Sequence, residues 1–415
     1  MSYKQEFAKY WPQLLGVCIA VSFGVTLNSY TANIFGPAML AEFGWSKADY
    51  AFAGTFTFIS LIFTPIAGRL VDAYGYRLAG TIGFLAMSAA YFALSLMTGD
   101  IWQYYAIIMF KNVIGVLTTS MVFSRVVVAR FNNARGLALA IPASASPLIG
   151  SLAVILVGGI LATDGWRAGY RVLALACLVG GIVAIALCGH EKRIVVQGPA
   201  VGKAFDLRDV AEVLKRRAAV LLIAGMFLVN IPQTVLSSQL GILLSDKGMG
   251  KDFIVWLVSL YPIGVTIGRF FTGLLLDMLR PHLVALVMLA LPAIGLAVLA
   301  TTANANWVLT LMILVIGISQ GAEGDVGAYL ASRKFELRHY SFIFSLIFAS
   351  VGAGTSTGAL LLSYSLATSD SFGSFLLLSV MATLMGALCF FLTGWCRDAR
   401  EASPETGTMP IPASA

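Results

Sequence analysis

The chain has 415 residues, of which 59% are hydrophobic and only 11% are charged, and its formal net charge is +7. A soluble globular protein carries about 25% charged residues, so this sequence has too few charges to cover a water-facing surface. The composition disfavours a soluble enzyme or a soluble nucleic-acid-binding protein. It indicates a polytopic membrane protein, whose charges gather at the ends of long apolar runs.

Twelve apolar runs follow one another along the chain. A membrane-spanning helix needs about 20 mostly apolar residues, and the only long charged stretch, residues 191–217, falls between the sixth and seventh runs. The sequence therefore predicts an all-α membrane protein with twelve transmembrane helices in two six-helix halves. The runs cover residues 12–37, 49–69, 79–98, 103–127, 136–162, 171–189, 218–243, 253–276, 283–302, 307–331, 340–366 and 373–396.

The runs divide the chain into four parts. We expect an N-terminal half over residues 1–190, a cytoplasmic linker over 191–217, a C-terminal half over 218–400 and a C-terminal tail over 401–415. Nineteen lysines and arginines lie on the side of both termini and the linker, and five lie on the opposite side. Because cytoplasmic loops are enriched in these residues, we expect a multi-pass protein of the cytoplasmic (inner) membrane with both termini in the cytoplasm.

A short segment with glycine and charged residues occurs twice in the chain. The segment 68–72 closes the second run and the segment 273–277 closes the eighth, and their aspartates, Asp72 and Asp277, lie 205 residues apart. This offset is almost half of the chain. Parallel repetition of this kind is typical of secondary transporters, in which two halves enclose a central site.

The segment 68–77 resembles the signature loop between the second and third spans of the major facilitator superfamily, and the resemblance extends over nearly the whole chain. It implies alternating access, with a cytoplasmic charge clasp that holds the outward-facing state. A basic loop that merely orients the helices is the alternative, and the second copy has Pro281 in place of a glycine. The implied gating residues are Gly68, Arg69, Asp72, Gly75, Arg77, Gly273, Asp277, Arg280, Arg125 and Arg135.

Within that superfamily, four segments resemble the branch of monocarboxylate transporters and oxalate/formate antiporters. They are residues 135–140, 165–167, 268–269 and 321–325. The chain departs from this branch at Val265, where monocarboxylate transporters of animal type carry an aspartate, and at Ile347, where oxalate/formate antiporters carry a lysine. These departures disfavour a direct copy of their proton mechanism and a dicarboxylate substrate such as oxalate.

Two basic residues lie deep in predicted helices, where a charge costs about 2.5–3.5 kcal/mol and therefore implies a partner or water. Arg269 resembles the arginine with which this branch holds the substrate carboxylate, a task suited to the planar guanidinium fork. Its alternative role is an ion pair with Glu323 or Asp325. Lys111 in the fourth run either faces the cavity as a second cation or extends to the outer interface.

Glu323 and Asp325 are the only acids plainly inside a predicted helix. The three histidines all fall at cytoplasmic ends, which makes them poor carriers of a buried proton. The two carboxyl groups are therefore the candidates for proton coupling. The alternative is a fixed ion pair that shapes the gate.

Polar side chains of the first and seventh runs are candidates for the lining of a central cavity. Asn28 and Gln233 lie 205 residues apart, at equivalent positions of the two halves. Their amides can orient a carboxylate, although polar groups in membrane helices also bridge neighbouring helices. The predicted substrate contacts are Arg269, Lys111, Asn28, Tyr30, Asn230, Gln233, Tyr261 and Gln320.

The sequence contains no nucleotide-binding, paired-metal or hydrolase motif. We therefore expect a non-enzymatic symporter that needs no cofactor or metal, binds no nucleic acid and acts as a monomer in the lipid bilayer. Its expected cargo is an organic anion, a mono- or aromatic carboxylate, taken up with protons. The alternatives are an exporter or siderophore-type permease for a bulkier, less acidic molecule, and a carboxylate exchanger.

Overall fold

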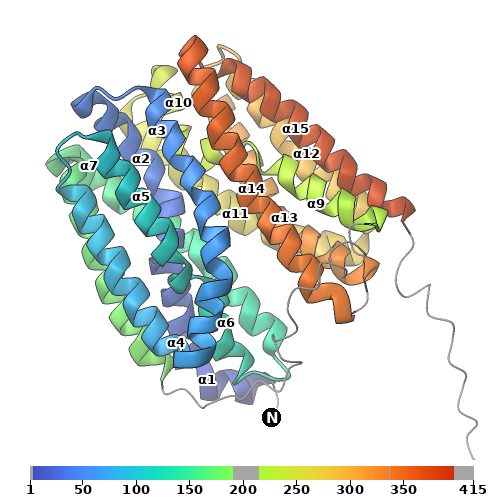
Figure 1. Cartoon of the computed structure of the whole chain (residues 1–415). Helices are drawn as coiled ribbons and strands as arrows, with labels where there is room; N and C mark the ends of the chain where they lie inside the picture. Colours follow the sequence, from blue (N-terminus) through green and yellow to red (C-terminus); the bar gives the residue numbers. More distant parts are fainter. Residues whose placement is uncertain (1–2, 190–214, 336, 397–415) are drawn as a thin grey trace, which may run out of the picture.

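The computed structural model describes residues 3–189, 215–335 and 337–396, which form helices and short connections without any strand. The predicted linker lies almost wholly outside the described residues, and the predicted tail from residue 401 onward lies outside them altogether. Figure 1 shows the two helical halves side by side, with residues up to 189 in one and residues from 215 in the other.

The first half begins with two consecutive helices that together make one span. Its elements are α1 (Tyr3–Phe23), α2 (Val25–Phe43), α3 (Lys47–Phe52), the 3₁₀ turn η1 (Ala53–Phe56), α4 (Thr57–Ser95), α5 (Ile101–Gly115), the 3₁₀ turn η2 (Val116–Thr118), α6 (Ser120–Val128) and α7 (Arg135–Cys188).

The second half begins with a span that contains a π-helical turn. Its elements are α9 (Arg217–Val229), the π-helical η3 (Val235–Gln239), α10 (Leu240–Asp246), α11 (Lys251–Met278), α12 (Pro281–Ala300), α13 (Asn306–Lys334), α14 (Leu337–Ser369), α15 (Gly373–Leu392) and the 3₁₀ turn η4 (Thr393–Trp395).

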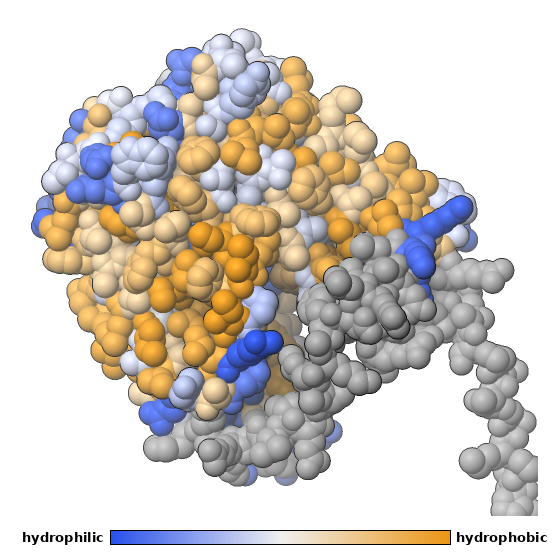
Figure 2. Space-filling view, in the orientation of Figure 1, coloured by the Kyte–Doolittle hydropathy of each residue, from blue (hydrophilic) through white to orange (hydrophobic). Residues whose placement is uncertain are grey.

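The described helices account for the twelve predicted spans. Nine helical segments are long and apolar enough to cross a membrane. Two of these segments, in α4 and α7, turn back at Gly75 (φ 84°) and Gly165 (φ 80°), and each therefore counts as two spans. Positive φ values of this size favour glycine. The interrupted helix α9–η3–α10 makes the twelfth. The predicted all-α fold is confirmed, and hydrophobic side chains cover the middle of the face in Figure 2.

The first and fourth spans are interrupted at the same depth, where they touch. Helix α1 ends before Gly24, and the backbone N–H of Val25, which the break leaves free, donates to Thr118 Oγ1 at 2.9 Å. A side chain at position 24 would meet Thr118 within 2.5 Å. Glycine is therefore needed for the close approach that joins these two interruptions.

The two halves are joined by buried polar contacts as well as by apolar packing. Asn33 on α2 donates to the Leu236 carbonyl at 2.7 Å and accepts from the Leu240 N–H at 2.9 Å. These two backbone groups lie in and just after the π-helical turn, so the Asn33 amide satisfies both of them. Between α7 and α11, Ser151 donates to the Ser259 carbonyl at 2.8 Å.

Candidate substrate cavity

A cavity of about 980 Å³ lies between the two halves. Its wall in the first half comes from the elements α2 to α7, including the turns η1 and η2, and its wall in the second half comes from the interrupted seventh span and from α14. Ligand pockets for small molecules have volumes of about 300–1,000 Å³. The cavity is therefore large enough for a metabolite and lies at the interface where alternating-access transporters bind their cargo.

The cavity is closed at one end and open at the other. Tyr50, Tyr104 and Tyr170 line the closed end and are 2%, 6% and 3% exposed. At the other end, the lining residues Met121 and Phe348 are exposed. This open end lies on the side where α1 begins, because the turn after α6 donates backbone N–H groups to Glu6.

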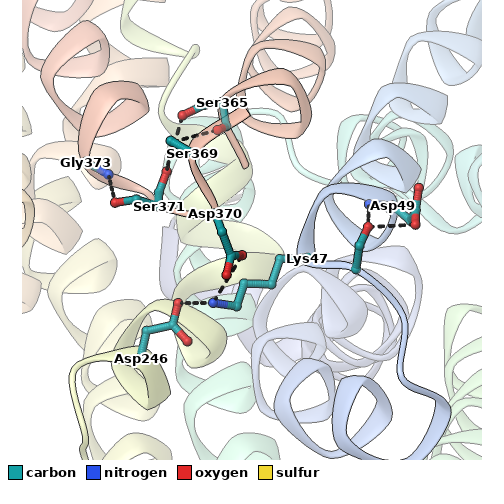
Figure 3. Close-up of polar contacts among 9 residues, drawn as sticks. Lys47, Asp49, Asp246, Ser365, Ser369, Asp370, Ser371 and Gly373 are labelled. Atoms are coloured by element: carbon teal, nitrogen blue, oxygen red, sulfur yellow. Dashed lines mark hydrogen bonds and ion pairs between the residues drawn. The ribbon is translucent and has the colours of Figure 1, made fainter. Parts of the chain in front are cut away.

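An ion-pair clasp ties the halves together beyond the closed end. Lys47 at the start of α3 contacts Asp246 Oδ2 at 2.8 Å and Asp370 Oδ1 at 3.6 Å (Figure 3). Asp246 ends α10, and Asp370 lies between α14 and α15 with a φ of 47°. These are the only ion pairs between described residues that connect the two halves. We call this end of the bundle the clasp end.

Lys111 on α5 is a buried cation on the cavity wall. It is 3% exposed, and its ammonium donates to Asn28 Oδ1 at 2.6 Å and lies 5.6 Å from the Tyr91 ring centroid. It forms no ion pair with any described residue. Because an ammonium has three donors and one positive charge, most of its capacity to bind an anion is unused.

Glu323 on α13 is a buried acid that forms no ion pair with any described residue. It is 6% exposed, and its two oxygens accept hydrogen bonds from the amides of Asn230 and Gln320, the latter at 2.6 Å. The amide of Asn230 also donates to the Met226 carbonyl, whereas the Asn230 Oδ1 atom is buried and has no hydrogen-bond partner among the described residues. Glu323 does not line the cavity.

Arg269 on α11 forms no ion pair with Asp325, Glu323 or any other described residue. Arg269 Nε is buried and has no hydrogen-bond partner in the described part of the chain. Arg269 is not on the cavity wall in this conformation, so its substrate role stays a prediction.

The other predicted contacts separate into a wall layer and a layer behind it. Asn28 and Gln233 line the cavity, as their equivalent positions predict. The ring centroids of Tyr30 and Tyr261 lie 6.5 Å apart. Behind the wall, at positions that do not line the cavity in this conformation, are Tyr30, Asn230, Tyr261 and Gln320.

The two copies of the repeated loop differ in their charge contacts. In the first copy, Asp72 pairs with Arg125 of α6 within the same half. In the second copy, Asp277 and Arg280 are exposed and form no ion pair with described residues. No ion pair between described residues joins the halves at the open end, so the predicted clasp between the halves at the cytoplasmic side stays a prediction for the other conformation.

The remaining predicted gating residues lie around this loop. A side chain at Gly68 would meet the Met121 methyl group at 2.9 Å, so α4 and α6 are in close contact there, whereas Gly273 faces open space. Arg135 donates to the carbonyls of Phe131 and Val128, and thus caps the turn that follows α6. Arg69 is exposed, and Arg77 and Gly75 are half-buried.

A set of hydroxyl side chains that line the cavity is absent from the residues predicted above. Thr57, Ser60 and Thr64 lie three and four residues apart on α4, and all three face the cavity. Such spacing places side chains on one face of a helix. A row of hydroxyl residues on one face of an apolar helix could therefore have predicted this part of the cavity wall from the sequence. The Lys47 clasp was also not predicted, because its partners, at the end of α10 and between α14 and α15, are far from Lys47 in the sequence.

The sequence of this chain is similar to a known family and to individual transporters. A family model described as the Major Facilitator Superfamily matches residues 18–322 and 222–411. The MFS-type transporter of Gibberella moniliformis is 25% identical over 361 residues, 85% of this chain and 81% of the relative. The MFS transporter asaE of Aspergillus flavus is 22% identical over 81% of this chain and 74% of the relative.

Solved structures show the same arrangement of helices. The nucleoside transporter NupG has a TM-score of 0.75 at 13% identity, with 92% of this chain and 99% of that chain covered. A bacterial homologue of the human lysosomal transporter Spinster, in an inward-facing and unoccupied conformation, has a TM-score of 0.70 at 13% identity, with 94% and 97% covered. At these identities the likeness concerns the fold alone.

Proposed function

The chain belongs to the Major Facilitator Superfamily, and we propose that it is a secondary active transporter that takes up an organic monocarboxylate, aliphatic or aromatic, together with a proton. The proposed membrane is the cytoplasmic membrane, with both termini in the cytoplasm. In that orientation the open end of the cavity faces the cytoplasm and the clasp end faces outward.

The observation that carries this proposal is the buried ammonium of Lys111 on the cavity wall. Its polar contact among the described residues is one neutral amide oxygen, that of Asn28. A buried charge without an opposite charge is strongly unfavourable, and an ionisable residue within a membrane marks a substrate or ion pathway. A substrate carboxylate in the cavity would supply the missing negative charge.

A second buried group supports proton coupling. The Glu323 carboxyl is held by two amide donors and has no cation at ion-pair distance among the described residues. If Glu323 takes up a proton, Asn230 can turn its amide so that the unpaired Oδ1 accepts it, because amide oxygen and nitrogen are nearly equivalent in shape. Glu323 can therefore change charge without the loss of a salt bridge.

The resemblance to the monocarboxylate branch, through residues 268–269 and 321–325, also favours a carboxylate. The purified protein is reconstituted in liposomes, and the uptake of radiolabelled mono- and dicarboxylates is measured with an acidic or neutral outside. Protein-free liposomes correct for passive entry of the protonated acids. We expect acid-stimulated, uncoupler-sensitive accumulation of a monocarboxylate, and its loss in Lys111→Gln.

The same measurement separates the rival functions. Uncoupler-insensitive uptake that needs a carboxylate inside would identify an exchanger. No uptake or binding of any carboxylate would overturn the organic-anion proposal and leave an exporter of a less acidic molecule.

A further inference from the structure

The charges on the cavity wall have one sign. Among the described residues that line the cavity, Lys111 is the only lysine or arginine, and none is Asp or Glu. A substrate with an ammonium group would therefore find no carboxylate on this wall, which disfavours amino acids and amines. The wall is complementary to a single negative charge.

The rest of the wall is rich in hydroxyl groups. Twelve of the thirty lining residues are serines or threonines, and they come from both halves. Asn28, Asn112 and Gln233 add amides to the same surface. An apolar acid would have to displace water from these groups without replacing its hydrogen bonds, which lowers affinity.

Several of these hydroxyls can only accept a hydrogen bond from a ligand. Ser60, Thr64 and Thr119 donate to carbonyls of their own helices at 2.7, 2.6 and 2.8 Å. A hydroxyl has one donor and two lone pairs, so its oxygen remains available toward the cavity. These side chains fit substrate groups that carry a hydrogen, such as hydroxyls.

Other hydroxyls of the wall are free to donate or accept. Four of them make no hydrogen bond with any described residue, and they lie on α2, α4 and α6. They are Ser29, Thr57, Ser120 and Ser124. The hydroxyls that can only accept and those that can also donate thus lie on one surface. Such a surface can hydrogen-bond with several hydroxyl groups of one substrate molecule.

The aromatic rings at the closed end of the cavity already stack on other rings. Tyr50 stacks on Tyr104 with ring centroids 5.3 Å apart, and Tyr170 stacks on Phe35 at 3.9 Å. Rings stacked in this way have fewer free faces for an aromatic substrate. The closed end therefore favours an aliphatic cargo over an aromatic one.

We infer that the cargo is an aliphatic monocarboxylate with several hydroxyl groups, of the sugar-acid type, whose carboxylate binds at Lys111 and whose hydroxyls bind along the serine and threonine wall. This inference rests on the proposed function, because it assumes that the cavity carries an organic anion. It narrows the substrate class within that proposal.

The test compares gluconate with hexanoate, which have the same six-carbon chain and the same carboxylate but differ in hydroxyls. Binding of each sodium salt to the purified, full-length protein is measured by titration calorimetry, which avoids passive membrane entry of hexanoate. We expect gluconate to bind at least about tenfold more tightly, since each neutral hydrogen bond contributes about 0.5–1.5 kcal/mol. Equal or tighter binding of hexanoate, or of benzoate, would overturn the inference and leave the organic-anion function standing.

Variants test whether the serine and threonine wall binds the hydroxyl groups of gluconate. Thr57→Val and Ser124→Ala should each weaken gluconate binding about 2- to 10-fold and leave hexanoate unchanged. Lys111→Gln should weaken both anions. Thr310→Val, which removes an exposed hydroxyl bonded to the Asn306 carbonyl outside the cavity, is the matched control. Equal losses for both anions in Thr57→Val would indicate a structural defect and refute the hydroxyl contacts, whereas no binding of either anion by the unmodified protein would instead refute the proposed function.

Discussion

Each half holds a buried ionisable side chain in its fourth span, and the two side chains have opposite charges. In the fourth span of the first half, Lys111 lies four residues before Gly115, and in the fourth span of the second half, Glu323 lies four residues before Gly327. Each is held by an asparagine from the first span of its own half, Asn28 or Asn230.

The surroundings of these two positions differ as well. Lys111 lines the cavity and belongs to an interrupted span, because the 3₁₀ turn η2 follows α5. Glu323 belongs to the uninterrupted helix α13 and does not line the cavity. The fourth span of each half thus contains one buried ionisable side chain. Because the two residues differ in charge and in access to the cavity, their proposed roles differ: Lys111 binds the anion, and Glu323 binds the proton.

The largest expected effect follows from removal of the positive charge at Lys111. Lys111→Gln should raise the dissociation constant for the carboxylate about 10- to 100-fold, because a hydrogen bond to a charged group contributes about 1.5–3 kcal/mol. Titration calorimetry measures this change. Lys251→Gln, at an exposed lysine at the start of α11, serves as the control. An unchanged dissociation constant in folded Lys111→Gln would remove the proposed anion site from the first half.

Substitution of Arg269 sharpens the same comparison. Arg269 does not line the cavity in this conformation, so Arg269→Gln should weaken carboxylate binding less than Lys111→Gln does. If Arg269 holds the carboxylate through its fork, Arg269→Lys should weaken binding nearly as much as Arg269→Gln. A larger loss at Arg269 than at Lys111 would assign the main anion contact to the second half.

The second expected effect concerns the acid of the C-terminal half. Glu323→Gln keeps an amide that can bond to Asn230 and Gln320 but cannot release a proton. Proteoliposomes with this variant should exchange labelled for unlabelled carboxylate, yet the pH gradient should drive no accumulation, so the inside-to-outside ratio falls to about 1 by linkage. Asp325→Asn is the neighbouring control. Accumulation that persists in Glu323→Gln and vanishes in Asp325→Asn would transfer the proton site to Asp325.

The fold could be predicted from the sequence because it depends on the length, spacing and repetition of apolar runs. The cavity could be predicted only in part. Asn28 and Lys111 lie on its wall, but Tyr30, Tyr261 and Glu323 lie behind it, because hydropathy indicates the span to which a residue belongs and not the face of the helix that meets the cavity. The Lys47 clasp depends on a helix start, a helix end and a turn that meet only in the folded chain.

A third, smaller effect distinguishes the two copies of the repeated loop. Asp72→Asn removes the ion pair with Arg125, whereas Asp277→Asn removes no ion pair between described residues. We expect the uptake rate to fall severalfold in Asp72→Asn and to change little in Asp277→Asn, with carboxylate binding intact in both. Initial rates at saturating substrate measure this difference. Equal rates in the two variants would mean that neither copy gates transport in preference to the other.

The smallest expected effect concerns the clasp end, where the halves meet. The side chains of Lys47 and Asp246 are 25% and 37% exposed, and such an ion pair contributes about 0.2–1 kcal/mol. Lys47→Gln should therefore shift the balance between inward-open and outward-open states by at most about fivefold. Spin labels on either side of the clasp, with Cys389 and Cys396 replaced, report this population as a change in distance distribution.

Salt offers an independent check on the same contact, because exposed ion pairs are screened as ionic strength rises. The unmodified protein should move toward the outward-open state in high salt, whereas Lys47→Gln should respond less. Lys247→Gln is the matched control, since Lys247 lies at the same end but donates to the carbonyls of Thr301 and Ala303 rather than to a carboxylate. An identical salt response in all three proteins would show that the buried Asn33 contacts and apolar packing, and not the Lys47 ion pairs, hold the clasp end closed.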